Sequence, residues 1–248
     1  MRLEDTTVVV TGASRGLGAA MARAFVAEGA RVVCAARTAA DLNAVVADAE
    51  GPGEAMAVPT DVREWASVAE LFEAARDAYG PIDVVVANAG VQQRTAGGDR
   101  REPVVDVPVD VWDAVIRTNL SGAFHTAKAA LPEMLERDAG RIVFISSGAG
   151  TTGRANRSPY IASKHGLEGL ASSLAKELDG SGVDSLVFRP PGGGVYTESR
   201  SYRERESYAH ESPTVVNEPM VQLASGAGDH GGHYVGTADG TGFEDDTQ

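Results

Sequence analysis

Tyr160 and Lys164 are two side chains of opposite acid–base character separated by three residues. On a helix this spacing places both on one face, one turn apart. A free tyrosine titrates at about 10, which is too high for proton transfer at neutral pH. A neighbouring cation favours the phenolate and lowers the tyrosine pKa toward the range of a general acid or base. The pair therefore indicates a site of proton transfer.

A third candidate, Ser147, follows the apolar run 141–145 and precedes Tyr160 by thirteen residues. In a doubly wound sheet, ligands bind at the carboxyl ends of the strands, where a hydroxyl can hydrogen-bond a substrate oxygen as charge develops on it. A Tyr-x-x-x-Lys spacing alone is common by chance, and Ser147 at a strand end gives it a catalytic context. The three residues together predict a catalytic site at this strand end.

The stretch that organises the chain is the apolar run 7–10 followed by Gly12, Gly16 and Gly18. Glycine permits positive φ and lets the backbone approach a ligand closely. Because residues 19–25 are good helix formers, the stretch predicts strand, tight turn and helix, with free N–H groups aimed at a pyrophosphate. This context favours a dinucleotide site over a purely structural turn.

Strand-like and helix-like segments alternate along the rest of the chain. Apolar runs predict strands at 7–10, 31–35, 55–58, 82–87, 141–145, 183–188 and 233–236, and helical spacing predicts helices at 19–25, 38–49, 67–79, 109–136, 159–178 and 215–224. The alternation predicts one α/β domain over 1–240, a Rossmann-type doubly wound parallel sheet of about seven strands with helices on both faces. We expect substrate loops at about 91–108 and 190–213 and a flexible tail at 241–248.

Three local signals refine these boundaries. Thr38 with Asp41 resembles a capped helix start. Pro132 predicts a kink or break near the end of the helix 109–136. Trp65 and Trp112 are interpreted as anchors of the core or of an interface.

Composition restricts the partners. The 248 residues carry a net charge of −13, which argues against a nucleic-acid partner because a phosphate backbone would be repelled. No apolar run approaches the roughly 18 residues of a membrane span, and the first residues lack the pattern of a signal peptide, so we expect a cytoplasmic protein without a membrane partner. Lys128, Lys164 and Lys176 are the only lysines. An acidic, lysine-poor chain suits a high-salt (halophilic) cytoplasm, with codon bias toward arginine as the alternative.

Metal chemistry is not expected. Cys34 is the only cysteine, which excludes an intrachain disulfide or a cysteine cluster. The five histidines show no ligand spacing. Arginines in the two loops that should border the substrate are either surface charge or receptors for a substrate carboxylate or phosphate; they are Arg94, Arg100, Arg101, Arg154 and Arg157.

These motifs together resemble the classical short-chain dehydrogenase/reductase family over nearly the whole chain. The matching residues, in the family's order, are Thr11 to Gly18, Asp61-Val62, Asn88-Ala89-Gly90, Asn119, Ser147, Tyr160 and Lys164. The resemblance implies that Tyr160 is the general acid/base and that Ser147 polarises the carbonyl. It implies that Lys164 binds the ribose and lowers the tyrosine pKa, and that Asn119 holds a water linking Lys164 to solvent.

The resemblance also implies a set of cofactor-binding residues. They are Gly12, Ser14, Arg15, Gly16, Leu17, Gly18, Arg37, Asp61, Val62, Asn88, Ala89, Gly90, Tyr160, Lys164, Pro191, Gly192 and Thr197. Asp61 would bond the adenine amino group, Val62 would flank the ring, and Thr197 would reach the nicotinamide carboxamide. Two positions depart from the family's pattern: Ala87 replaces an asparagine, and the stretch 192–194 has one extra glycine.

The second strand favours NADP over NAD. NAD requires an acidic residue at the end of this strand to bond the ribose 2′-hydroxyl, and Ala36 stands there instead. Arg37 follows, and Arg15 lies in the glycine turn, so two guanidinium groups can receive a 2′-phosphate. The alternative is that Arg15 is merely solvated, since the family tolerates it with either cofactor, and that Arg37 caps the next turn; NAD would then remain possible.

The sequence therefore predicts an NADP(H)-dependent oxidoreductase that acts on a small-molecule carbonyl or secondary alcohol. A 3-oxoacyl-thioester reductase and a sugar or polyol dehydrogenase remain open within the family. A non-catalytic dinucleotide-binding regulator is the alternative from another class, although such a protein has no need of the tyrosine and serine. The resemblance further implies a homotetramer or homodimer.

Overall fold

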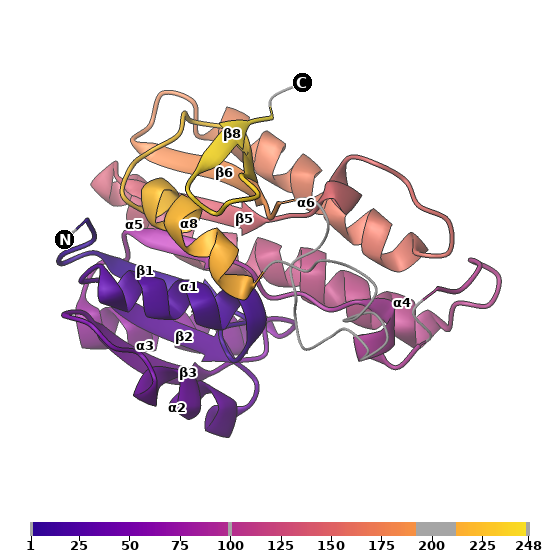
Figure 1. Cartoon of the computed structure of the whole chain (residues 1–248), viewed down its shortest axis with the longest axis horizontal. Coiled ribbons are helices and arrows are strands. Elements are labelled where there is room, and N and C mark those ends of the chain that lie inside the picture. Colours follow the sequence, from indigo (N-terminus) through magenta and orange to yellow (C-terminus); the bar gives the residue numbers. More distant parts are fainter. Residues whose placement is uncertain (1, 99–100, 192–211, 247–248) are drawn as a thin grey trace.

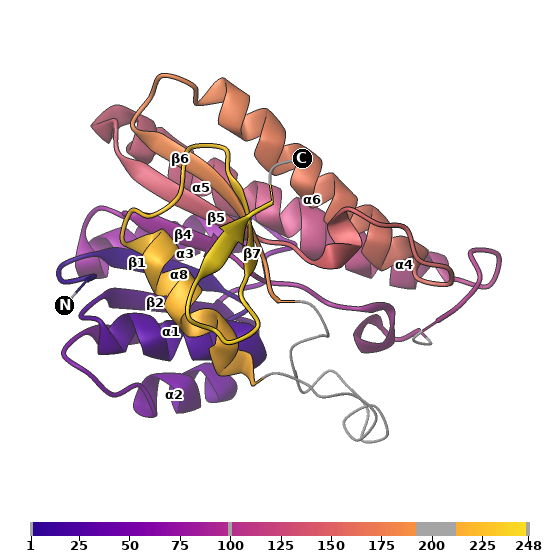
Figure 2. The same cartoon turned by 45° about the horizontal axis from the view of Figure 1, so that its top comes forward.

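The computed structural model describes residues 2–98, 101–191 and 212–246, which contain an eight-stranded sheet with helices on both faces (Figures 1 and 2). The strands are β1 (Thr7–Thr11), β2 (Arg31–Ala36), β3 (Glu54–Pro59), β4 (Val84–Ala87), β5 (Gly140–Ile145), β6 (Val183–Arg189), β7 (His233–Gly236) and β8 (Phe243–Asp245). Their order is β3-β2-β1-β4-β5-β6-β7-β8. The first seven are parallel, as predicted, and β8 pairs antiparallel with β7.

Two helical layers enclose the sheet. One face is covered by α1 (Gly16–Ala27), α2 (Ala39–Ala47) and α8 (Asn217–Ala224), with α1 and α8 side by side in Figure 1; the other is covered by α3 (Trp65–Tyr79), α5 (Gly122–Arg137) and α6 (Ser158–Glu177). Successive β1 side chains alternate between the two cores, Val8 and Val10 toward one and Val9 toward the other. No helix in the described ranges has the length and apolar character needed to cross a bilayer.

The strand order reverses beside β1, which lies between β2 and β4. This switch point opens a crevice at the carboxyl ends of the strands, where α/β sheets bind their ligands. Asn88, just after β4, ties the two strand ends together because its Nδ2 donates to Thr11 O at 2.8 Å and its backbone N donates to Thr11 Oγ1 at 3.1 Å.

The predicted helix 109–136 is interrupted at a different place than expected. A π-helical turn, Arg117–Ser121, joins α4 (Val109–Ile116) to α5, and Asn119 lies within it. Pro132 does not break α5, which continues through it to Arg137 with the proline on the exposed side. Thr38 does precede α2, but its side chain makes no capping hydrogen bond within the described residues, so the capped start is wrong in that detail.

The tail expected to be flexible differs from that expectation over Phe243–Asp245, which form β8. The Phe243 ring packs against Tyr234 of β7 with centroids 4.7 Å apart. Asp246 pairs with Arg189 at the end of β6. Three residues with two acidic side chains carry no strand pattern of their own, and these tertiary contacts order the segment.

Candidate active site

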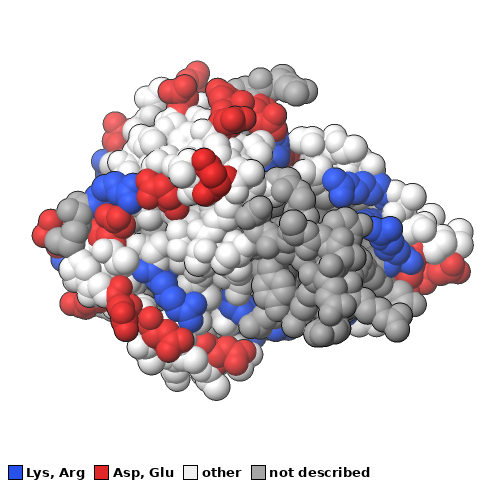
Figure 3. All heavy atoms as spheres, viewed as in Figure 1, with Lys and Arg blue, Asp and Glu red and all other residues white. Residues whose placement is uncertain are grey.

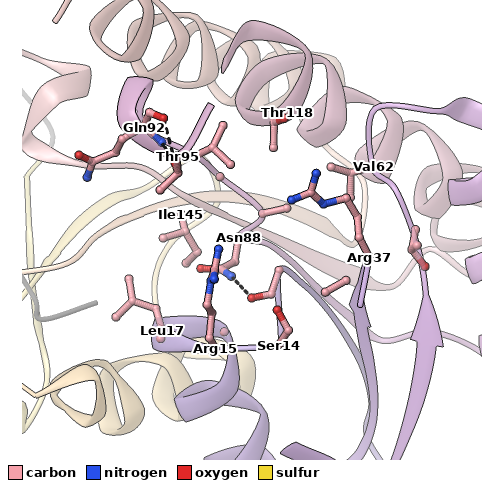
Figure 4. Close-up of a pocket in the computed structure, with 18 of the residues that line it drawn as sticks. Ser14, Arg15, Leu17, Arg37, Val62, Asn88, Gln92, Thr95, Thr118 and Ile145 are labelled. Carbon is pink, nitrogen blue, oxygen red and sulfur yellow. Dashed lines mark hydrogen bonds between the residues drawn. The ribbon is translucent and has the colours of Figure 1, made fainter. Parts of the chain in front are cut away.

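A cavity of about 350 Å³ opens at the switch point (Figure 4). The predicted site residues that line it are Gly12, Ser14, Arg15, Gly16, Leu17, Gly18, Arg37, Asp61, Val62, Asn88, Ala89, Gly90, Tyr160 and Lys164. Side chains predicted for cofactor binding and for proton transfer therefore border one space. Sequence reasoning missed several other lining residues, among them Arg63, Gln92 and Ser146.

The glycine turn needs glycine for two physical reasons. Gly12 and Gly16 have φ of +69° and +57°, in the left-handed region that favours glycine. A Cβ on Gly18 would lie 2.3 Å from Gly12 O, and one on Gly12 would lie 2.8 Å from the Ala89 Cα. The turn therefore packs tightly against the end of β4 and begins α1 at Gly16, so that the free N–H groups of this helix form an anion-binding end.

Tyr160 and Lys164 occupy successive turns of α6, as the spacing predicts. Lys164 Nζ lies 6.0 Å from the centroid of the Tyr160 ring and donates to Ile145 O at 2.7 Å. Burial lowers the pKa of Lys164 to about 8, although the charge of Glu168 opposes this effect. A second cation, the Arg157 guanidinium, lies 5.1 Å from the same ring centroid. Two positive groups therefore flank the phenol.

Ser147 and Asn119 are not among the residues lining this cavity, but both adjoin it. Ser147 follows Ser146 at the end of β5, and its Oγ accepts from Ala149 N at 3.2 Å. Asn119 bonds both backbone groups of Val91, and its Nδ2 lies 3.0 Å from the Oγ of Ser163, the residue before Lys164. Asn119 thus connects the loop after β4 to α6 beside the lysine.

The arrangement matches a known family. The family model described as "short chain dehydrogenase" matches residues 6–207. The chain belongs to this family. A short-chain dehydrogenase is an oxidoreductase that uses a nicotinamide dinucleotide on a CH–OH or C=O group, and the cavity at the switch point is where such a cofactor would bind.

Individual relatives agree with this assignment. A D-beta-hydroxybutyrate dehydrogenase of Rhizobium meliloti is 36% identical over 222 residues, covering 87% of this chain and 83% of that protein. A 3-oxoacyl-[acyl-carrier-protein] reductase of Thermotoga maritima is 35% identical over 191 residues, covering 77% and 75%. The crystal structure of a metagenomic short-chain oxidoreductase in complex with NADP superposes with a TM-score of 0.78 at 33% identity, covering 92% and 93%.

Two charged side chains of this short-chain dehydrogenase, at the end of the cavity formed by the glycine turn and β2, are accessible. Figure 4 shows Arg15, from the glycine turn, and Arg37, from the end of β2, extending into the cavity. Ala36, where NAD-binding proteins carry an acid, also lines it, as does Asp41. The donor set of two guanidinium groups beside a small residue fits the 2′-phosphate of NADP.

Asp61 is engaged by a residue that sequence reasoning missed. Arg63 Nε donates to both of its carboxylate oxygens, at 2.9 and 3.0 Å, and Arg63 Nη2 bonds it at 2.5 Å. These bonds lower the pKa of Asp61, and the charge of Arg37 adds to the effect. Val62 is buried and packs against Gly122, where a Cβ would lie 2.7 Å from Val62 Cγ2. The sequence signal that could have indicated the Asp61–Arg63 pair is the presence of an arginine two residues after the aspartate.

The predicted residues after β6 are only partly described. Pro191 is buried beside β7, close to Gly236. Gly192 and Thr197 lie outside the described residues, as do Gly193 and Gly194 in the stretch with the extra glycine. The cofactor roles of these residues stay predictions.

Beside the cavity lies a largely buried polar cluster, called the buried cluster below, which comprises Glu168, Arg189, His233, Ser146 and the partly exposed Asp246. Arg189 Nε and Nη2 bond the two Glu168 oxygens at 2.9 and 2.8 Å. Burial opposes ionisation of Glu168, but hydrogen bonds from His233, Arg189 and Ser146 outweigh it and lower its pKa to about 2. The only local signal for this cluster is that Glu168 follows Lys164 by one helical turn.

Proposed function

We propose that this protein is an NADP(H)-dependent oxidoreductase that interconverts a carbonyl and a secondary alcohol, with Tyr160 as general acid/base. The observation that carries the proposal is that Tyr160 and Lys164 line the same cavity as the glycine turn. A non-catalytic dinucleotide-binding protein would need only the turn. NADP(H) supplies the hydride when bound, and the protein supplies orientation and the proton.

The protein's own residues have distinct roles in this proposal. Tyr160 holds the proton exchanged with the substrate oxygen. The ammonium of Lys164 and the guanidinium of Arg157 both lie close to the ring, where positive charge favours the phenolate over the neutral phenol. Ser147, at the end of β5, hydrogen-bonds the substrate oxygen as charge develops on it. Asn119, which bonds the backbone of Val91 and the hydroxyl of Ser163, holds the water of a proton relay in this proposal.

Cofactor selection follows from Arg15 and Arg37. Both side chains extend into the cavity and can hold a 2′-phosphate by charge-assisted hydrogen bonds. The glycine turn binds the pyrophosphate through the amino end of α1, and Val62 flanks the adenine. A role of Asp61 toward the adenine requires that its carboxylate be shared with Arg63, which already bonds both oxygens.

For the substrate we propose a 3-oxoacyl or 3-hydroxyacyl compound. The relatives support this class, since one is named for 3-hydroxybutyrate and another for a 3-oxoacyl thioester. Both names describe oxidation or reduction at the carbon β to a carboxyl or thioester group. A sugar or polyol is the alternative that a substrate panel distinguishes.

The exposed aromatic residues support a second copy of this chain as the binding partner. Trp65 and Trp112 are 43% and 37% exposed, so their interpretation as core anchors is wrong. Phe124 and Leu135 of α5 are also exposed, and Trp65 lies near Phe124 because Lys128 contacts both rings. Apolar side chains of this size on neighbouring helices are typical of a subunit interface. We propose a homodimer or homotetramer in the cytoplasm, to be checked by light scattering of wild type and Phe124→Asp.

The decisive experiment combines cofactor titration with turnover. Quenching of protein fluorescence by NADPH and NADH in the same buffer gives the two Kd values, and cofactor absorbance follows reduction of 3-oxoacyl thioesters, free 3-oxo acids and sugars. We expect tighter NADPH and turnover of a 3-oxoacyl compound that Tyr160→Phe abolishes. Equal or tighter NADH would contradict the cofactor assignment. Turnover that survives Tyr160→Phe would contradict the role of tyrosine.

A further inference from the structure

Glu168 continues the catalytic face of α6. It follows Lys164 by one turn, as Lys164 follows Tyr160, so a phenol, an ammonium and a carboxylate lie in one row. Glu168 is 9% exposed and is held from the far side by Arg189 and by His233 Nδ1, 3.0 Å from its Oε2. A carboxylate held by three bonds from two residues is fixed in position and can in turn fix a group that bonds it.

The backbone that Glu168 holds is the segment containing Ser147. Ser146 Oγ donates to Glu168 Oε1. Gly150, at the other end of the turn, lies so close that a Cβ there would be 2.6 Å from the same oxygen. One turn earlier, Lys164 Nζ bonds Ile145 O. Two successive turns of α6 therefore contact residues 145–150 on both sides of Ser147.

We propose that Glu168 is a positioning residue for Ser147, acting through the hydroxyl of Ser146. The inference rests on the proposed function, since it assigns Ser147 to the substrate oxygen. Arg189 fixes the carboxylate, and Asp246 fixes the guanidinium from the far end of the chain. A buried ion pair is seldom more stabilising than apolar side chains of similar volume. Stability alone therefore does not account for a charged cluster against this strand end.

Ser146→Ala is the sharpest test, because it breaks the bond between Glu168 and the strand end and leaves the ion pairs intact. Ser185→Ala is the matched control: Ser185 is 1% exposed and its Oγ bonds Ala171 O at 3.0 Å, so it also joins a strand to α6, on β6 rather than beside Ser147. Both variants lose one buried hydroxyl bond, and we expect similar falls in Tm.

Only Ser146→Ala should loosen the active-site turn. Backbone amide hydrogen exchange over residues 147–151 should accelerate about fivefold or more, the scale of one lost hydrogen bond. The kcat should fall by about tenfold, with the cofactor Kd and substrate KM within about twofold of wild type, because a shift of the serine costs orientation rather than affinity. Ser185→Ala should leave the exchange rate of this turn and kcat unchanged.

Two further variants separate positioning from charge. Glu168→Gln retains one oxygen that accepts from Ser146 but places an amide NH2 against Arg189 Nη2 and His233 Nδ1. We therefore expect a lower Tm, with kcat closer to that of wild type than to that of Ser146→Ala. The double variant Glu168→Leu with Arg189→Met replaces the pair by apolar side chains that should fold. It offers Ser146 no acceptor, so its kcat and exchange should resemble those of Ser146→Ala.

The outcomes distinguish this inference from the proposed function. Hydrogen exchange is measured without substrate, so it tests whether Glu168 and Ser146 hold the Ser147 segment even if the protein reduces no carbonyl compound. Absence of carbonyl reduction would contradict the proposed function but not the positioning role. Exchange over 147–151 that is equal in Ser146→Ala and Ser185→Ala would overturn the positioning role. Faster exchange in Ser146→Ala without a fall in kcat would also overturn the positioning role, because holding this segment in place would then have no effect on the reaction.

Discussion

The two ends of the cavity hold their charged groups in opposite ways. At the end that we propose binds the cofactor, called the cofactor end below, Arg15 and Arg37 are exposed, and the close contacts are made by backbone at Gly12 and Gly18. At the chemical end, Lys164 is 5% exposed and Glu168 9%, and each is bonded to a fixed partner. Figure 3 shows charged side chains of both signs at the surface of the face it views, whereas Lys164 and Glu168 are charged groups in the interior.

This difference predicts how substitutions act at each end. Exposed arginines on a backbone scaffold can change with little effect on folding, so substitutions there should alter cofactor affinity and selectivity. Buried charges that hold one another in place affect stability when one is removed, and they affect rate where they orient reacting groups. Substitutions at the chemical end should therefore change rate and stability, whereas substitutions at the cofactor end should change cofactor affinity.

The largest effect is expected at the chemical end. Tyr160→Phe should lose about 10²-fold or more in kcat while retaining cofactor affinity, because only the proton donor is removed. Lys164→Ala should lose rate and weaken cofactor binding as well, since the ammonium lies in the same cavity. Lys176→Ala, an exposed lysine on the same helix, is the matched control and should leave both unchanged. Steady-state kinetics and fluorescence titration make the comparison.

Acid should weaken the chemical end through Glu168. Its pKa is lowered from 4.5 to about 2 by hydrogen bonds from His233, Arg189 and Ser146, which outweigh the opposing effect of burial. A lowered carboxyl pKa stabilises the fold above the unfolded value, and the gain is lost as the pH falls through the folded value. Between about pH 4.5 and 2, wild type should lose about 3 kcal/mol more unfolding free energy than Glu168→Leu with Arg189→Met.

Denaturant unfolding at a series of pH values measures this difference. The double variant lacks the titrating carboxyl and its partner, so the difference between the two curves reports the Glu168–Arg189 pair together with the contact of Arg189 to Asp246. Parallel curves for the two proteins would show that Glu168 titrates alike in the folded and unfolded chains. The buried cluster would then make no pH-dependent contribution to the free energy of unfolding, and the two ends of the cavity would not differ in this respect.

At the cofactor end, Arg37→Asp should invert cofactor selectivity. Each charge-assisted bond to the 2′-phosphate contributes on the order of 1.5 to 3 kcal/mol, so losing one costs about tenfold or more in NADPH affinity. The new carboxylate repels the phosphate and can accept from the ribose hydroxyl of NADH. Because Arg37 is exposed, Tm should stay within about 2 °C of wild type. Unchanged selectivity would mean that this arginine is solvated.

The sequence predicted the parts of the molecule that rest on local patterns. Seven strands, the glycine turn and the Tyr160–Lys164 face each follow from the spacing of neighbouring residues. The buried cluster did not follow, because its members come from β5, α6, β6, β7 and the tail, and one sequence does not reveal which distant charges meet. β8 was missed for the same reason. Arg63 was missed although it stands two residues from Asp61.

The smallest effect is expected from salt, and it should act on the exposed charges. With a net charge of −13, surface carboxylates repel one another, and screening over a few ångströms relieves that repulsion at molar salt. Tm should therefore rise by a few degrees from low to molar potassium chloride. In a chain of this size such a rise corresponds to about 1 kcal/mol of unfolding free energy. Buried pairs are screened much less, so Glu168→Leu with Arg189→Met should show the same rise as wild type. A flat or falling Tm would favour codon bias as the cause of the composition. A larger rise in the double variant than in wild type would show that salt screens the Glu168–Arg189 pair, because screening weakens an attractive pair that only wild type has.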